Sequence, residues 1–133
     1  MDRITIGKQV EFSKSFTKQN ILDFSQVSED NNPIHVDKNY ATNSIFGNQV
    51  VHGVLLVGMF SKIFGTLYPG NGSIYLGQTS KFIKPAFIDE LILARVTLIS
   101  FDYDKNQGIF LTECFKDSDV LILTGEAKIL FPR

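Results

Sequence analysis

The sequence has a single cysteine, no tryptophan and no cluster of like charges. Cys114 cannot form an internal disulfide, so we expect a reducing compartment and a cytoplasmic location. The 13 basic and 14 acidic residues are scattered, which leaves no basic stripe for a nucleic acid. The most apolar stretch, residues 50–64, contains His52, Ser61 and Lys62 and is too short to cross a bilayer. No apolar run of the signal-peptide type follows Met1. Nucleic-acid binding, disulfide stabilisation and membrane insertion are therefore not expected.

Length and composition favour one globular domain over residues 1–133. The hydrophobic fraction is 44% and the aromatic fraction 12%, which is enough for a substantial core. A chain of this size buries about two-thirds of its unfolded surface, so it needs no disulfide or metal to fold.

The first half predicts a strand and two helices. Alternating residues indicate a strand over 8–16, and Thr17 is a suitable cap for a helix over 18–27 with one apolar stripe. Pro33 disfavours helical dihedrals at the residue before it, so residues 28–36 are expected to form a loop. Asp37 is expected to cap a short helix that ends near residue 42.

The second half predicts a buried helix followed by strands. Residues 50–67 are apolar all round a helix, which requires protein on every side. After a breaker cluster at 69–72, strands are expected over 73–82, 91–101, 108–115 and 120–130, with turns at 102–107 and 116–119. This order predicts an α+β hotdog fold, an antiparallel sheet wrapped around one long helix. Because such a sheet has exposed edges, we expect a homodimer.

The densest polar segment is residues 28–37. Asp30 and His35 are five residues apart across a loop held by Pro33, so both side chains can converge on one small molecule. A carboxylate and an imidazole around one water are suited to adding that water to a double bond. Two alternatives remain open from spacing alone. Asp30 and Asn32 could be ordinary turn residues, or a metal could be held by Asp30, His35, Asp37 and His52, although no ligand spacing is diagnostic.

The segment Asp30-x-Asn32-Pro33-Ile34-His35-x-Asp37 resembles the signature of the MaoC-like hydratases, also called hydratase 2. The resemblance continues through Ala41, Phe46-Gly47, Val50-Val51-His52-Gly53, Phe60-Ser61, residues 69–78, Phe82 and Pro85. This longer pattern is similar to the short bacterial (R)-specific enoyl-CoA hydratases that supply polyhydroxyalkanoate synthesis.

The resemblance implies a lyase that adds water to trans-2-enoyl-CoA in a syn fashion and yields (R)-3-hydroxyacyl-CoA. It implies that Asp30 and His35 hold the water and that the backbone N–H of Gly53 binds the thioester oxygen. Asn32 and Ser61 are implied as residues that orient the catalytic pair. No metal and no added cofactor are implied, since coenzyme A is part of the substrate. For Gly53, tight packing of helix against sheet is an alternative reason for glycine, and His52 is interpreted as a buried, satisfied histidine.

Two positions depart from the family pattern. Glu29 and the pair Asp89-Glu90 stand where the family usually has glycine before the aspartate and a Gly-Asp turn. If those glycines use positive φ, this chain is expected to take another backbone path there. Cys114 is expected to be a buried core thiol. Four cations are candidates for the phosphates of coenzyme A: Lys62, Lys81, Lys84 and Arg95.

Three other activities are compatible with the same fold. A hotdog acyl-CoA thioesterase would direct water at the carbonyl carbon, and a dehydratase could act on acyl carrier protein through the same pantetheine arm. A non-catalytic subunit that binds acyl thioesters is the third, although the presence of both Asp30 and His35 weighs against it.

Overall fold

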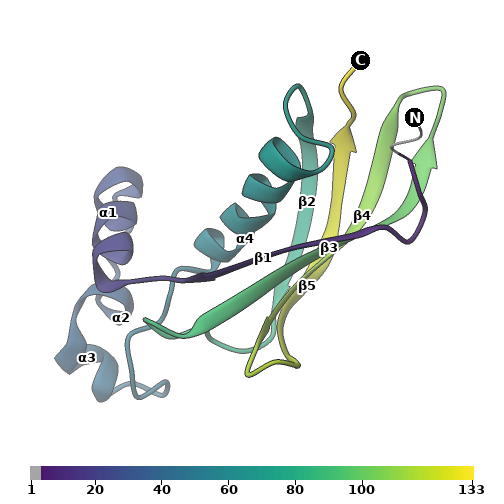
Figure 1. The fold of residues 1–133 in the computed structure, drawn as a ribbon. Coiled ribbons are helices and arrows are strands. Elements are labelled where there is room, and N and C mark those ends of the chain that lie inside the picture. Colours follow the sequence, from purple (N-terminus) through teal and green to yellow (C-terminus); the bar gives the residue numbers. More distant parts are fainter. Residues whose placement is uncertain (1–3) are drawn as a thin grey trace.

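The computed structural model describes residues 4–133. The elements are β1 (Gln9–Ser15), α1 (Lys18–Ser28), α2 (Pro33–Val36), α3 (Lys38–Thr42), α4 (Gly53–Lys62), the π-helical turn η1 (Ile63–Leu67), β2 (Ile74–Phe82), β3 (Leu91–Asp102), β4 (Gln107–Lys116) and β5 (Val120–Leu130). Figure 1 shows α4 lying along one face of a curved sheet, with α1, α2 and α3 gathered in a lobe beyond one end of that helix.

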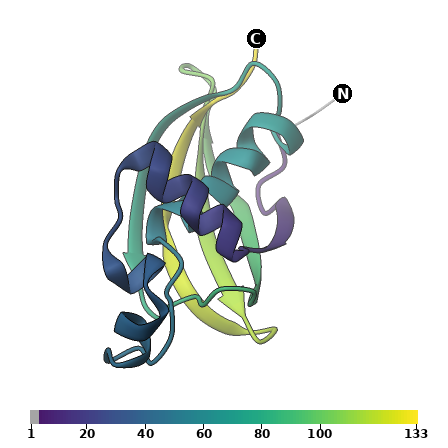
Figure 2. The ribbon, with the colours of Figure 1, turned by 90° about the vertical axis from the view of Figure 1, so that its left-hand side faces the viewer.

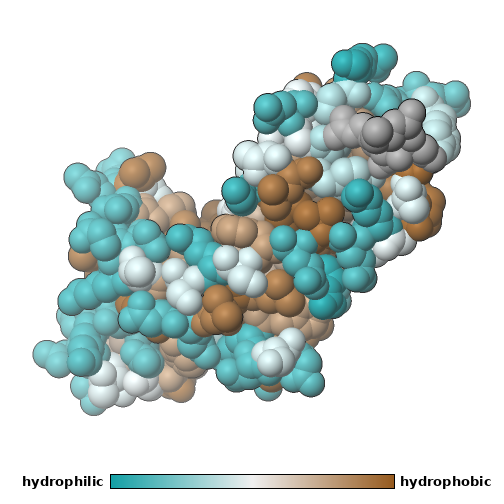
Figure 3. Space-filling model, viewed as in Figure 1, coloured by the Kyte–Doolittle hydropathy of each residue, from teal (hydrophilic) through white to brown (hydrophobic). Residues whose placement is uncertain are grey.

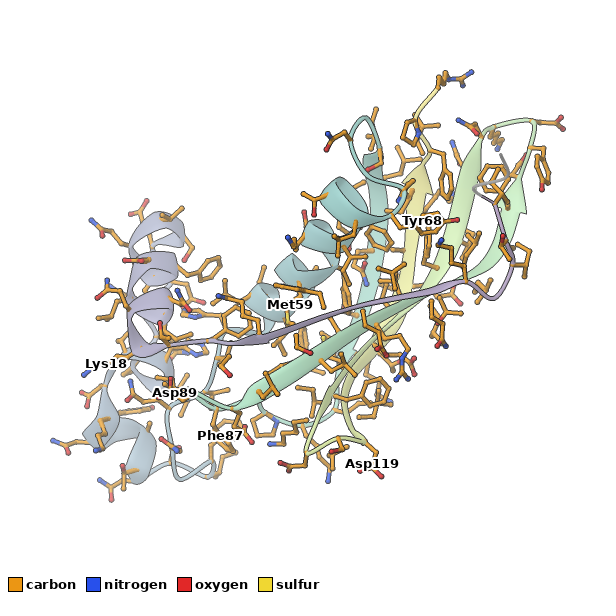
Figure 4. The ribbon with its side chains drawn as sticks, viewed as in Figure 1. Lys18, Met59, Tyr68, Phe87, Asp89 and Asp119 are labelled. Carbon is orange, nitrogen blue, oxygen red and sulfur yellow. The ribbon has the colours of Figure 1, made fainter. Side chains whose placement is uncertain are left out.

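The described residues form one antiparallel sheet of five strands in the order β1-β3-β4-β5-β2. In β3 and β4 buried residues alternate with more exposed ones, as expected for strands with one face on a core. The core lies between this face and α4, and Met59 and Phe60 of α4 are almost completely buried. Figure 4 labels Met59 beside α4, between the helix and the strands. A sheet wrapped around one helix is the predicted hotdog fold.

The central helix begins three residues later than residue 50 and is not buried all round. Val51 N–H donates to the Ala86 carbonyl at 2.8 Å, and Val50 forms a β-bridge with Phe87. Val50 and Val51 are therefore extended. Val54, in the first turn of α4, is 63% exposed. The prediction of complete burial was therefore wrong within one chain. Some apolar residues of 50–67 are not helical, since Val50 and Val51 are extended, and others lie on an exposed face of α4. The pattern of apolar residues alone does not distinguish these from the buried face of the helix.

The α1–α3 lobe follows local capping rules. Thr17 and Asn20 form a reciprocal capping box at the start of α1, and the side chain of Asp37 accepts from Tyr40 N–H at the start of α3. The prediction of an irregular loop over 28–36 was wrong at its end, because Pro33 begins α2. Proline suits the first position of a helix, and Asn32 caps it by accepting from Ile34 N–H. In Figure 2, α1 runs across the front of the molecule. Figure 3 shows a notch between this lobe and the remaining part of the viewed face.

Glu29 and Asp89 both adopt positive φ, at 63° and 68°. The expectation of a different backbone path was therefore wrong: these residues keep the left-handed conformation without glycine. Glu29 ends α1 as a left-handed cap, and Asp89 is held by a 2.8 Å hydrogen bond from its N–H to the Phe16 carbonyl. Figure 4 labels Asp89 near the start of β3.

Among the described residues, no helix combines the length and apolarity needed to cross a membrane.

Candidate active site

Asp30 is held largely through its main chain, and its carboxylate is partly exposed. Its N–H donates to Ser28 Oγ at 3.0 Å, and its carbonyl oxygen lies 3.1 Å from His52 Nε2. One carboxylate oxygen accepts from Asn32 N–H at 3.3 Å. The side chain is still 51% exposed. The other carboxylate oxygen lies 4.0 Å from His52 Nε2, and the exposed carboxylate can still accept a hydrogen bond from a small molecule.

His35 is oriented by the segment that precedes α4. Its Nδ1 lies 2.6 Å from the Val50 carbonyl oxygen, and its own carbonyl accepts from Gln49 Nε2 at 2.9 Å. A carbonyl oxygen can only accept, so the hydrogen-bond network assigns the proton of neutral His35 to Nδ1. Nε2 therefore carries the lone pair. Val50 N–H in turn donates to the Ile34 carbonyl at 3.2 Å, which ties this segment to α2.

The structure brings the two predicted acid–base groups together. One carboxylate oxygen of Asp30 and one nitrogen each of His35 and His52 all lie within 4.8 Å of one another. A single water with hydrogen bonds of about 2.8 Å at a tetrahedral angle joins atoms about 4.6 Å apart. The upper limit of 4.8 Å between Asp30 and His35 is compatible with one bridging water molecule.

His52 lies under this pair and is 2% exposed. Its ring stacks on that of His35, with centroids 3.8 Å apart and planes at 23°. Burial, together with the neighbouring His35, lowers the pKa of His52. The interpretation of a satisfied histidine was right for Nε2 and wrong for Nδ1, which has no hydrogen-bond partner within residues 4–133.

Beside His35 lies an apolar pocket of about 410 Å³. Its walls include Ile34 and His35 of α2, Val51 before α4 and Gly53 at its first position, and residues 82–86, which begin at the last residue of β2. Gly53 is the first residue of α4, so its N–H has no acceptor inside the helix, and no other described residue accepts from it. A Cβ built on Gly53 would lie 2.6 Å from a ring carbon of Phe82. A side chain at this position would displace the Phe82 ring, and glycine leaves an N–H at the wall of the pocket.

Asn32 and Ser61, the two residues predicted to orient the pair, differ in their distance from it. Asn32 lies between Asp30 and His35, as cap of the helix that carries His35. Ser61 is exposed and lies eight residues beyond Gly53, which corresponds to about 12 Å along a helix. Within the described chain it makes no hydrogen bond to Asp30 or His35, so the structure does not bring Ser61 to the pair.

The four candidate cations are also distinguished by their surroundings. Arg95 pairs with Glu11 at 2.7 Å, and Lys62 lies over the ring of Phe12. Lys81 is exposed and does not line the pocket, whereas Lys84 does. Sequence reasoning gave no role to Gln49 or Ser25, because neither polar side chain stands out until the structure shows it buried beside a histidine.

The wrapped sheet, the acid–base pair and the adjoining apolar pocket define a hotdog-fold protein with a site for proton transfer. The model of the MaoC like domain matches residues 3–110, and the chain belongs to the MaoC-like family. It is 36% identical to an (R)-specific enoyl-CoA hydratase of Aeromonas caviae, over 97% of this chain and 96% of that protein. A second relative, the (R)-specific enoyl-CoA hydratase of Rhodospirillum rubrum, is 34% identical over 95% of this chain and 87% of its own length.

The solved structures include a similar molecule, the (R)-hydratase from Aeromonas caviae involved in polyhydroxyalkanoate (PHA) biosynthesis. It superimposes with a TM-score of 0.94 at 36% identity and covers 97% of this chain and 98% of its own. The hotdog fold of the present chain is therefore shared over nearly its whole length.

Proposed function

We propose that this protein catalyses the reversible hydration of trans-2-enoyl-CoA to (R)-3-hydroxyacyl-CoA by syn addition of water. The observation that carries the proposal is the placement of Asp30 and His35 within 4.8 Å of each other, with His35 in the wall of an apolar pocket. The named relatives support the same reaction. We accordingly propose that it is a lyase.

In this mechanism one water is held between the Asp30 carboxylate and the Nε2 lone pair of His35. The pair removes a proton from the water as its oxygen bonds to C3 of the enoyl group, and returns a proton to C2. Because both groups approach from one side of the alkene, hydroxyl and proton add to the same face. Positioned acid–base groups of this kind contribute about 10²–10⁴ in rate.

Attack at C3 moves charge onto the thioester carbonyl, which acquires enolate character. The N–H of Gly53 is the donor for this oxygen, and it lies at the positive end of the α4 dipole. Glycine allows the thioester to approach the main chain closely. The acyl chain occupies the apolar pocket between α4 and residues 82–86.

The test is the hydration of crotonyl-CoA, followed by loss of the ultraviolet absorbance of the conjugated thioester, with release of free thiol measured in parallel. We expect loss of absorbance without thiol release, and an (R) product by chiral analysis. Asp30→Asn and His35→Ala are each expected to lower kcat by at least about 10²-fold while the fold is retained. Thiol release by the native chain would indicate a thioesterase instead, and near-normal hydration by either variant would refute the assigned pair.

No metal is assigned to the cluster of Asp30, His35 and His52. His52 Nε2, which lies 4.0 Å from the Asp30 carboxylate, faces the Asp30 carbonyl oxygen at 3.1 Å, so it carries a hydrogen and has no lone pair for a metal. We therefore propose that hydration needs no metal and no added cofactor. Activity that falls after dialysis against a strong chelator and returns with a divalent cation would contradict this.

We also propose a homodimer formed through β2. This strand is an edge of the sheet, and three apolar residues along it are about half exposed: Ile74, Leu76 and Phe82. Pairing with a second copy would remove this edge from solvent. Light scattering is expected to give twice the chain mass, and Leu76→Lys is expected to shift the mass toward the monomer. A native chain that is monomeric at assay concentration would refute the proposal.

A cytoplasmic location and a role in polyester precursor supply complete the proposal. The lone, fully buried Cys114 is compatible with a reducing compartment, and the solved (R)-hydratase of similar structure is described as involved in PHA biosynthesis. Co-expression with a polyester synthase should raise polymer yield, and the Asp30→Asn variant should abolish the increase. Equal yields with both chains would refute the role.

A further inference from the structure

We propose that His52 is a positioning residue for the reaction, which sets the spacing between Asp30 and His35 by binding the main chain of one and supporting the ring of the other. The inference rests on the proposed function, and it deepens the account of that site. His52 occupies the N-cap position of α4 yet makes no side-chain cap bond there. Its side chain is directed to other contacts.

The first contact is with Asp30. His52 Nε2 lies 3.1 Å from the Asp30 carbonyl oxygen and 3.2 Å from Ser25 Oγ. The carbonyl oxygen can only accept, so Nε2 carries the hydrogen and donates it. The opposite tautomer would place two acceptors against each other and would leave a buried N–H at Nδ1 without a partner, since no described residue reaches that atom.

The second contact is with His35. The rings stack at 3.8 Å, and the edge of Phe24 packs against His52 at 4.7 Å. The face of His52 therefore supports the plane of the catalytic ring, while the Val50 carbonyl fixes its rotation. One buried imidazole thus touches both members of the acid–base pair.

The adjacent residues explain why the support comes from this position in the chain. Val50 orients His35, His52 holds both groups, and Gly53 presents the N–H at the pocket wall. Val51 anchors the segment to Ala86 through its 2.8 Å hydrogen bond. A displacement at His52 therefore changes the distance between the water-binding pair and the thioester site.

Two replacements of His52 distinguish the effect of its N–H donor from the effect of its stacked ring. Glutamine places an amide N–H near the position of Nε2, so His52→Gln keeps the bond to Asp30 O, whereas His52→Phe keeps a stacked ring and removes the donor. We expect His52→Phe to lower kcat by about 10–100-fold with KM for crotonyl-CoA changed less than about threefold, because a misplaced acid–base pair costs turnover more than binding. His52→Gln is expected to recover at least about tenfold of that loss in kcat.

A stability control separates positioning from general destabilisation. Ile92→Val removes one methylene from a fully buried site in β3 that does not line the pocket, and it should lower Tm without changing kcat. Native-like kcat in His52→Phe, or equal loss in His52→Gln and His52→Phe, would overturn the proposal.

A second measurement does not depend on turnover. The chain contains only two histidines, so each imidazole can be assigned in long-range ¹H–¹⁵N spectra by removing the other. We expect neutral His35 to be the Nδ1–H tautomer and His52 the Nε2–H tautomer. A neutral His52 with its hydrogen on Nδ1 would overturn the inference even if hydration is observed. If the native chain does not hydrate crotonyl-CoA, the proposed reaction fails, and the spectra still decide whether His52 donates to Asp30.

Discussion

Replacing Glu29 by glycine tests how the chain tolerates a left-handed residue directly before Asp30. Glu29 has φ 63° and ψ 10°. A side chain in this conformation costs about 1–2 kcal/mol, and glycine costs about 0.5–1 kcal/mol more entropy on folding, so the net gain for Glu29→Gly is about 0.5–1 kcal/mol. With about 2.1 cal/mol/K of unfolding entropy per residue over 133 residues, this raises Tm by about 2–4 °C.

The assay is thermal unfolding by circular dichroism at neutral pH, with denaturant unfolding as a second measure of the free energy of unfolding. Glu29→Ala is the matched control, because it removes the carboxylate and keeps a Cβ in the left-handed region. We expect Glu29→Ala to show no gain. A Tm for Glu29→Gly equal to or below that of Glu29→Ala would refute the argument from backbone strain.

The same variant has an expected effect on activity. Asp30 is held by Ser28 Oγ at its N–H and by His52 at its carbonyl, and both contacts remain in Glu29→Gly. We therefore expect kcat within about threefold of the native value. A larger loss would show that the restricted backbone of Glu29 itself helps to place the carboxylate.

The packing of Gly53 and the burial of His52 and Cys114 have consequences that can be measured. Gly53→Ala should lower kcat/KM by about 10–100-fold, because its Cβ would keep the thioester away from the main-chain N–H. The Cβ would also lie 2.6 Å from Phe82, so adding Phe82→Leu should restore Tm but not turnover. Full recovery of turnover would make Gly53 a packing residue only. Because burial lowers the pKa of His52 below 6.5, the unfolded chain binds an extra proton below that pH. The free energy of unfolding should therefore fall by at most about 1.4 kcal/mol per pH unit as pH drops, and His52→Gln should remove this part of the slope in denaturant titrations. Burial raises the pKa of Cys114 to about 12, so its thiol should react with a disulfide reagent at the rate of unfolding; rapid labelling of the native chain would contradict this.

The sequence predicted the sheet better than the lobe that carries the catalytic pair. The alternation in β3 and β4 and the caps at Thr17 and Asp37 are local signals, and the structure confirms them. Residues 50–67 show the limit of such signals. Val50 and Val51 are apolar like the helix that follows, and only their pairing with residues 86–87 makes them extended.

The sequence predicted that Asp30 and His35 converge, but it did not predict the contacts that orient their side chains. The spacing of Asp30 and His35 across Pro33 suggested convergence, and the two lie within 4.8 Å. The tautomer of His35 depends on the Val50 carbonyl, 15 residues away in the chain, and no local pattern contains that contact. The contact between Ser25 of α1 and His52, which directly precedes α4, also joins residues 27 apart in the chain.

Phe82 ends the edge strand β2 and also forms part of the pocket wall next to Gly53. A chain that pairs along β2 and an acyl group that enters the pocket therefore meet the same aromatic ring. Thermodynamic linkage requires that each event change the equilibrium constant of the other by the same factor, if the ring differs between the two states. A change in the dimerisation constant on adding a thioester would therefore report how strongly dimerisation changes the affinity of the pocket for that thioester. The same coupling would appear as a thioester affinity that depends on protein concentration.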